Sequence, residues 1–305
     1  AEDHKGNEWV GTGGGGLNRL RPRRIELWGP ERGLPFEAVL TVCEDSEGRL
    51  WITTMDGRLA QEGASGWEEW TARGDWPGGT AMCVAADPAG GVWVGTRERG
   101  LYRWNGHWVR FLQRSDGLRD VSIRSLCVVG PEEVWMAGAS QPVIQRWKAG
   151  RFLTYELPAG TRSIRALTVD AAGQVWVGTA DGLLLRVTGD GLRDETVLVE
   201  GRAPSIRSLH ATPDGAVWVG YAGYGLGRWF HGQWVRLTSA QGLGEDYISQ
   251  IVADGAGRLW FGANRGIFQA TLADLNAAAW GTGYVHSISY GRGEGLPALA
   301  ATYDS

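Results

Sequence analysis

Short hydrophobic runs separated by polar turns follow one another along the whole chain. In one stretch, such runs occupy residues 123–129, 134–137, 143–147 and 151–156, with Gly-, Asp- or Pro-containing turns between them. Runs of this length bounded by such turns are typical of β-strands. Only residues 272–279 (LADLNAAA) differ, because their Ala and Leu content predicts a short helix. The pattern therefore predicts an all-β protein with one inserted helix.

The strand pattern repeats, and each copy carries a tryptophan. The tryptophans recur every 41 or 42 residues, at Trp9, Trp51, Trp93, Trp135, Trp176, Trp218 and Trp260. An Asp-x-x-Gly turn or a variant precedes each one, and a phrase such as WVGT follows. Units of this length fit the four-stranded blades of a β-propeller. We therefore predict a single domain over residues 1–305, a seven-bladed β-propeller of four-stranded antiparallel blades.

The two ends of the chain predict how the ring closes. The first unit begins just before Trp9 and so lacks its first strand. Near the other end, the tripeptide GLP at 295–297 repeats the GLP at 33–35, which precedes a first strand. We therefore expect residues 298–305 to join the N-terminal blade as its missing strand. Such a closure would remove two open sheet edges.

The repeated phrase D-x-x-G-x-[LV]-W-[IVF]-G-T-x-x-G-L-x-R, followed by G-x-W and G-L-P, resembles the two-component regulator propeller repeat. Residues 87–103 (DPAGGVWVGTRERGLYR) and 254–267 (DGAGRLWFGANRGI) match it well. In that family the repeats form the periplasmic sensor part of bacterial histidine kinases and hybrid two-component proteins, and many members sense carbohydrates. The resemblance implies a periplasmic or extracellular bacterial location. It also implies that this chain is a partial sensor propeller or a stand-alone relative.

Composition excludes several classes of function. The chain has 48 glycines, 17 tryptophans and 30 basic against 34 acidic residues. This balance argues against nucleic-acid binding, which needs a strong positive field. No run approaches ~18 apolar residues, so we expect no membrane insertion of this segment. The cysteines Cys43, Cys83 and Cys127 lack metal-knuckle spacing and are expected to be small packed residues.

The sequence contains none of the common catalytic motifs. H-E-x-x-H, G-x-S-x-G and the phosphate-binding G-x-x-x-x-G-K-[ST] are absent, and the GxGxxG at 11–16 opens onto a strand instead of a helix. His210 occupies a register that Cys, Thr and Val hold in other blades, which indicates packing between blades. We therefore expect no catalytic residue, no metal and no cofactor, and we predict that the protein is not an enzyme.

One register of the first strand carries candidate binding chemistry. Eleven residues before the repeated tryptophan, in what we name the channel slot, stand Leu40, Met82, Arg124, Arg165, Arg207 and Ser249. The first strand of a blade is innermost, so the three arginines should lie on one arc at the mouth of the central channel. Arginine suits planar carboxylates and phosphates, which predicts a pocket for an acidic ligand. Alternatively, the arginines pair with Asp120, Glu195 or Asp246 and tie blades together.

The loops that follow the WxGT phrases should lie on the same face as the channel slot. They differ from blade to blade, and their candidate ligand contacts are Arg97, Tyr221, Tyr224 and Arg265. Aromatic rings beside hydrogen-bonding groups commonly form the wall of a sugar site. Alternatively, the two tyrosines are ordinary loop aromatics. The repeated tryptophans are expected to form the core between blades instead.

These observations favour a non-catalytic, ligand-binding sensor propeller of a bacterial two-component signalling protein. Its expected partner is a carbohydrate or an acidic small molecule at the channel mouth. One alternative is a protein-interaction scaffold, which would form a homodimer or bind another protein. A second alternative is a propeller lyase, which would need a His/Glu pair with metal support that the sequence does not offer.

Overall fold

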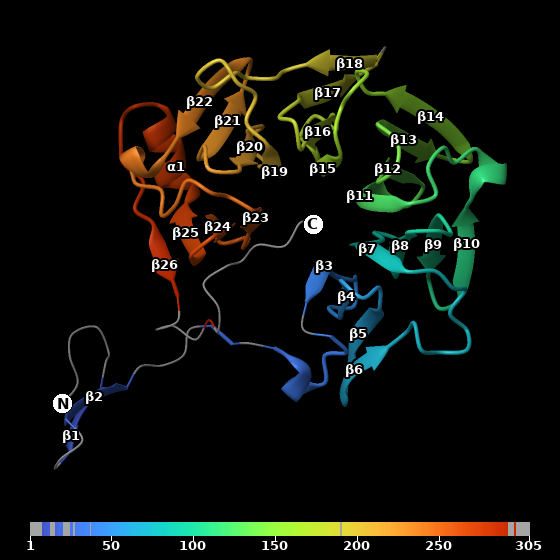
Figure 1. The fold of residues 1–305 in the computed structure, drawn as a ribbon, viewed down its shortest axis with the longest axis horizontal. Coiled ribbons are helices and arrows are strands. Elements are labelled where there is room, and N and C mark those ends of the chain that lie inside the picture. The colour runs from blue at the N-terminus through green and yellow to red at the C-terminus, as the bar shows by residue number, and fades with distance from the viewer. Residues whose placement is uncertain are drawn as a thin grey trace.

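The chain folds into antiparallel blades arranged around a centre. The computed structural model describes residues 8–12, 16–20, 25–26, 28–36, 38–189, 191–291 and 296. Within this part, six sheets have four strands each, and every strand pairs with its neighbour in the sequence. Figure 1 shows the first strand of each blade nearest the centre and the fourth at the rim. The predicted four-stranded antiparallel blades are confirmed.

The first three blades begin at residue 39. Blade 1 consists of β3 (Val39–Glu44), β4 (Leu50–Thr54), β5 (Leu59–Gly63) and β6 (Gly66–Glu69). Blade 2 consists of β7 (Ala81–Ala86), β8 (Val92–Thr96), β9 (Leu101–Trp104) and β10 (Trp108–Leu112). Blade 3 consists of β11 (Ile123–Gly130), β12 (Glu133–Gly138), β13 (Val143–Lys148) and β14 (Arg151–Glu156).

The next three blades follow the same plan. Blade 4 consists of β15 (Ile164–Val169), β16 (Val175–Thr179), β17 (Leu184–Thr188) and β18 (Gly191–Asp194). Blade 5 consists of β19 (Ile206–Ala211), β20 (Val217–Tyr221), β21 (Leu226–Phe230) and β22 (Gln233–Leu237). Blade 6 consists of β23 (Gln250–Ala253), β24 (Arg258–Ala263), β25 (Gly266–Thr271) and β26 (Ile288–Tyr290).

The structure has one α-helix and three 3-10 turns among its described residues. Helix α1 (Leu272–Ala279) lies between β25 and β26, where the sequence predicts it, and Thr271 caps it by accepting the backbone N–H of Asp274 at 3.0 Å. The 3-10 turns are η1 (Pro30–Arg32), η2 (Arg114–Asp116) and η3 (Ser239–Gln241). Across the described ranges, no helix has the length and hydropathy needed to cross a bilayer.

The prediction of seven blades is wrong, because the described residues form six. The unit around Trp9 forms only a two-stranded sheet, β1 (Glu8–Thr12) with β2 (Gly16–Leu20), and Figure 1 shows this hairpin apart from the blades. An isolated hairpin does not constitute a blade. The regular tryptophan spacing shows how often the sequence phrase is repeated. A blade forms only where four strands pair, and the copy around Trp9 does not meet this condition among the described residues. The predicted closing strand at 298–305 lies outside the described residues.

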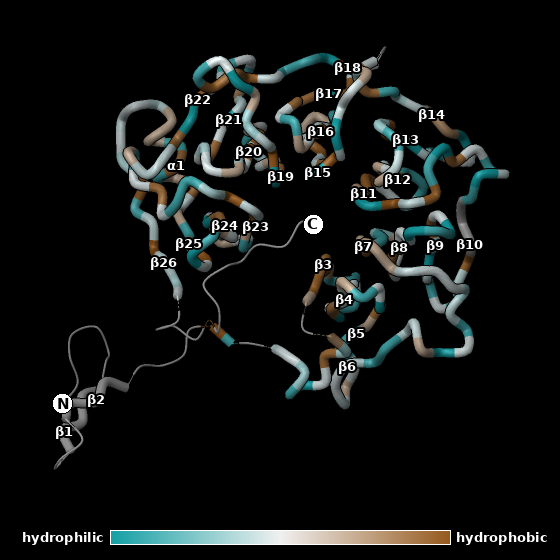
Figure 2. The backbone as a smooth tube through the Cα atoms, in the orientation of Figure 1, coloured by the Kyte–Doolittle hydropathy of each residue, from teal (hydrophilic) through white to brown (hydrophobic). Residues whose placement is uncertain are grey.

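The first strands of consecutive blades lie against one another. Contacts join β3 to β7, β7 to β11, β11 to β15, β15 to β19 and β19 to β23. Blades 1 and 6 are the two ends of this arc in Figure 1. In Figure 2, hydrophobic residues recur along the strands near the centre, and hydrophilic ones are frequent in the turns. The arc order places blades 3, 4 and 5 side by side, which matters for the channel slot.

The repeated tryptophans form core between blades, as predicted. Trp51, Trp93, Trp176 and Trp218 are fully buried, and Trp135 nearly so. Trp176, for example, packs with Val217 and Val219 of the next blade. Trp260 of blade 6 is only half-buried, because its blade stands at the end of the arc. Burying each indole stabilises the fold by about 1.5–3 kcal/mol or more.

Two charged side chains hold the repeated indole in several blades. The aspartate of the preceding turn accepts the indole N–H, at 2.8 Å from Trp51 to Asp45 and 2.8 Å from Trp176 to Asp170. The same aspartates accept backbone N–H groups of their turns, which confirms the predicted turn chemistry. An arginine of the third strand covers the indole face, as Arg186 does over Trp176 at 5.3 Å. Trp176 is thus fixed through three kinds of contact: core packing, a hydrogen bond to Asp170 and the guanidinium of Arg186 over its ring.

Candidate functional site in the central channel

The channel slot coincides with a β-bulge in the first strand of five blades. The pairing of first and second strands shifts register around Leu40, Met82, Arg124, Arg165 and Arg207. A bulge leaves the extra residue outside the regular alternation and re-aims its side chain. The slot is therefore a built feature of the repeat, in which the side chain differs while the backbone stays the same.

A packing contact between blades fixes the backbone just before the bulge. Ile206, immediately before Arg207, packs against Gly178 of the preceding blade, where a Cβ would lie 2.5 Å from its Cγ2. Ile123 meets Gly95 in the same way, with 2.7 Å to its Cγ2. The glycine of the WVGT phrase therefore leaves room for the isoleucine of the next blade. This wedge fixes where Arg124 and Arg207 leave their strands.

One central cavity of about 560 Å³ collects residues from the first strands of all six blades. Arg124, Arg165 and Arg207 line it together, each half-buried, and Leu40 lines it from blade 1. The lining residues of blade 6 are Gln250 and Val252. The structure thus brings the three slot arginines to one cavity, on neighbouring blades. Because guanidinium groups stay charged at every physiological pH, this side of the cavity is cationic.

The acids considered as partners of the slot arginines each have other partners. The carboxylate of Asp120 accepts the backbone N–H groups of Ser122 and Ser140 at 3.0 and 2.7 Å. Glu195 contacts Arg186 at 2.6 Å. Asp246 accepts the backbone N–H of Ser239 at 2.6 Å. Arg207 lies over the ring of Tyr247, with 5.9 Å from its Cζ to the ring centroid.

The four loop residues predicted as ligand contacts lie outside the lining of the central cavity, which the structure describes on all six blades. Arg97 is exposed, with its Nη2 3.6 Å from the Met82 sulfur, and Arg265 is exposed beside Glu245. Tyr221 is buried against Trp234, and its burial raises the pKa of its hydroxyl. Its interpretation as a wall of a sugar site is therefore wrong, because its ring completes the core between blades. Tyr224 is half-buried against the same core cluster.

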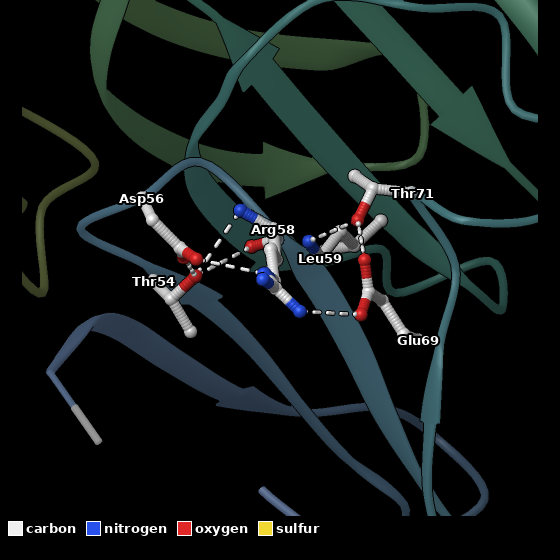
Figure 3. Close-up of polar contacts among 6 residues, drawn as sticks. All are labelled: Thr54, Asp56, Arg58, Leu59, Glu69 and Thr71. Carbon is white, nitrogen blue, oxygen red and sulfur yellow. Dashed lines mark hydrogen bonds and ion pairs between the residues drawn. The ribbon is translucent and has the colours of Figure 1, made fainter. Parts of the chain in front are cut away.

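In blade 1, the loop after the second strand holds its charges in a closed network (Figure 3). Arg58 donates from Nε to Asp56 at 2.7 Å and from Nη1 to Glu69 at 3.0 Å. Thr54 donates to the other oxygen of Asp56, and Thr71 donates to the other oxygen of Glu69. Burial alone would raise the pKa of Asp56, but hydrogen bonds from Thr54 and Arg58 outweigh it and lower that pKa. This loop is thus stabilised internally.

The titratable groups of the inner strands have the character of packed residues. Burial lowers the pKa of half-buried His210, in agreement with a packing role. Burial also raises the thiol pKa of Cys83 to about 12 and that of Cys127 to about 11. Among the described residues, no group of three or more His, Cys, Asp or Glu side chains is placed to hold a metal ion.

Sequence reasoning missed the arginine of the third strand. Arg103, Arg146, Arg186 and Arg228 pair directly across from the repeated tryptophans. The signal was present, since the repeated phrase ends in L-x-R. The bulge was also missed, because no residue type marks it. What the sequence did show is that the slot is occupied by arginine in three consecutive copies.

Comparison with known proteins agrees with the resemblance drawn from the repeat. Residues 33–56 match the family described as two component regulator propeller. No curated protein sequence matches the chain. The resemblance to that repeat is therefore confirmed over a segment that includes β3 and β4.

Solved structures with the same fold include both sensor and enzyme proteins. The extracellular domain of a protein classed as a hybrid two component system from B. thetaiotaomicron is 20% identical, with a TM-score of 0.72 over 98% of this chain and 41% of that one. A second such domain from B. thetaiotaomicron is 19% identical, with a TM-score of 0.66 over 88% and 39%. Virginiamycin B lyase from Staphylococcus aureus is 15% identical, with a TM-score of 0.62 over 83% and 84%.

The chain spans about two-fifths of the length of these two extracellular domains. At these identities the likeness establishes the fold. The protein is a β-propeller whose residues 33–56 match the family described as two component regulator propeller, and its fold is similar to that of extracellular domains of hybrid two component systems.

Proposed function

We propose that this propeller is the non-catalytic ligand-recognition domain of a bacterial two-component sensor and acts outside the cytoplasm. Its ligand is a small acidic molecule or an acidic carbohydrate, held in the central cavity. The observation that carries the proposal is the convergence of Arg124, Arg165 and Arg207, which occupy the same bulged slot in three neighbouring blades and line one cavity. The match to the two component regulator propeller supports the signalling context.

The cavity has the properties of a small-molecule site. Its volume of about 560 Å³ lies within the ~300–1,000 Å³ of ligand pockets. Guanidinium groups donate to planar oxyanions in pairs of parallel hydrogen bonds, which gives orientation as well as affinity. Fixed on bulges between packed blades, these groups are preorganised, so less side-chain freedom is lost when a ligand binds.

Isothermal titration with galacturonate, short oligogalacturonates and simple carboxylates tests the proposal. At least one anion should bind at one site per chain, and Arg165→Ala should weaken it about 10-fold or more, since a charge-assisted hydrogen bond contributes ~1.5–3 kcal/mol. Arg151→Ala, on the exposed outer strand β14, is the matched control and should leave the affinity unchanged. If no anion binds, or if both variants bind equally well, the proposal is wrong.

The same preparation separates the two other candidate functions. A scaffold would form a stable dimer in light scattering, or retain a partner protein, while ignoring every anion. A lyase would convert virginiamycin B, the compound in the name of the S. aureus enzyme. Anion binding that depends on Arg165, without turnover, is the result that our proposal predicts.

A further inference from the structure

The central cavity has two unlike sides. Blades 3, 4 and 5 contribute the three slot arginines, which follow one another because these blades are consecutive. Ser125 and Ser208 follow Arg124 and Arg207 in the sequence and belong to the same lining. This half of the cavity, which we name the cationic arc, presents charged donors beside Leu126, Leu167 and Leu209, whereas the other half has no charged residue in its described lining.

The other half of the cavity is lined mostly by apolar side chains. Its residues come from blades 1, 2 and 6 and are Val39, Leu40, Thr41, Val42, Cys83, Val84, Gln250 and Val252. Val42 is 61% exposed and Val252 is 58% exposed, although both belong to the innermost strands. In the slot itself, blade 1 carries Leu40 where blades 3 to 5 carry arginine. We name this half the apolar arc.

Val42 and Val252 leave apolar surface exposed on innermost strands, inside the central cavity. Apolar surface left in contact with water inside a cavity is available to an apolar part of a ligand. A sugar presents hydroxyl groups on most of its rim and would meet few hydrogen-bonding partners along the apolar arc. An alkyl or aryl group attached to a carboxylate would match both halves at once.

We propose that the ligand is an amphiphilic carboxylate, whose anionic group contacts the cationic arc and whose hydrocarbon part packs on Val42 and Val252 of the apolar arc. This proposal rests on the proposed function, because it assigns the ligand class of the same cavity. It places Val42 and Val252 as specificity-determining residues. It also gives the ligand one orientation, with its head toward blades 3 to 5 and its hydrocarbon tail toward blades 6 and 1.

The test is a calorimetric series of butanoate, hexanoate and octanoate, with hexan-1-ol and galacturonate as comparison ligands. Each methylene that packs on the apolar arc should strengthen binding about threefold to fourfold. Hexan-1-ol, which lacks the charge, and galacturonate, which lacks the hydrocarbon, should each bind at least 10-fold more weakly than octanoate. Raising the salt concentration should weaken binding of the whole carboxylate series.

Substitutions in the apolar arc and in the cationic arc test which part of the ligand each half of the cavity binds. Val252→Ser and Val42→Ser should each reduce octanoate affinity at least threefold while leaving galacturonate affinity unchanged, and Arg165→Ala should weaken both ligands. The two valines are more than half exposed, so these variants should fold, which an unchanged melting temperature checks. Val129→Ser, at an exposed position of β11 outside the cavity lining, is the matched control and should leave octanoate affinity unchanged.

The outcomes separate this inference from the proposed function. If galacturonate binds through Arg165 and affinity does not rise with alkyl length, the amphiphilic ligand class is wrong and the anion site stands. If affinity rises with alkyl length but both valine variants bind octanoate normally, the assignment of the apolar arc is wrong. If no carboxylate binds in an Arg165-dependent manner, both the proposed function and this inference are wrong.

Discussion

Removing the carboxylate of Asp45 tests whether the buried aspartate–tryptophan contact stabilises the blades. Asp45 accepts four hydrogen bonds, from the backbone N–H groups of Glu47 and Arg49, from Arg49 Nε and from the indole of Trp51. Its side chain is fully buried, and so is Trp51. In Asp45→Ala the indole N–H would lose its partner inside the core.

The expected loss of stability in Asp45→Ala depends on which of the four hydrogen-bond donors water can reach. The turn donors lie near the surface, so water replaces part of their loss, whereas a buried donor left unsatisfied costs about 1–3 kcal/mol. Adding the lost bonds to a charged acceptor, we expect Asp45→Ala to lower the free energy of unfolding by about 3–5 kcal/mol. Urea denaturation followed by tryptophan fluorescence measures it.

Blade 6 supplies the matched control for this experiment. Asp254 accepts the same four kinds of hydrogen bond, from Ala256, from Arg258 twice and from Trp260, but it lies at the open end of the arc and is exposed. Asp254→Ala should therefore cost clearly less than Asp45→Ala. Equal losses, or a loss below about 1 kcal/mol for Asp45→Ala, would refute the argument that burial makes this contact strong.

Two further predictions concern packing and pH. Gly178→Ala should destabilise the protein by about 1–3 kcal/mol through its clash with Ile206, whereas Gly189→Ala, with open space around its Cβ, should stay within about 0.5 kcal/mol in the same urea assay. Burial alone would raise the pKa of Asp45, but hydrogen bonds from Trp51 and Arg49 lower it below its usual 3.8. The ionised Asp45 therefore stabilises the fold fully above pH 3.8, and this stabilisation is lost as the pH falls through the lowered pKa. In Asp45→Asn, the free energy of unfolding should fall less steeply between neutral and acidic pH. An unchanged dependence on acidic pH would contradict this role of Asp45.

The blade plan could be predicted from sequence because its signals are local. A strand is predicted from a short hydrophobic run bounded by a turn, and every copy of the tryptophan-containing phrase has both. The helix at 272–279 was predictable for the same reason. The number of blades was not, because the copy around Trp9 has the phrase but only two paired strands among the described residues. Whether a sequence repeat forms a complete blade depends on strands that can be distant in the sequence.

In the candidate site, too, some features could be predicted from the sequence and others could not. The three slot arginines could be found by registering the copies, and innermost strands must bring one register to the channel. The loop residues could not be placed, because loop conformation depends on neighbours. Tyr221 follows WVG in the sequence, in the position of the threonine elsewhere, yet its ring is buried against Trp234. The bulge depends on backbone pairing and has no residue signature of its own.

The most direct test of the central claim is a crystal structure of the protein soaked with its tightest-binding carboxylate. We predict ligand density in the central cavity, with the carboxylate within hydrogen-bonding distance of at least two of Arg124, Arg165 and Arg207. Ligand density elsewhere on the propeller, or a cavity that stays without ligand at saturating carboxylate in solution and in the crystal, would contradict the claim that the channel slot forms an anion site.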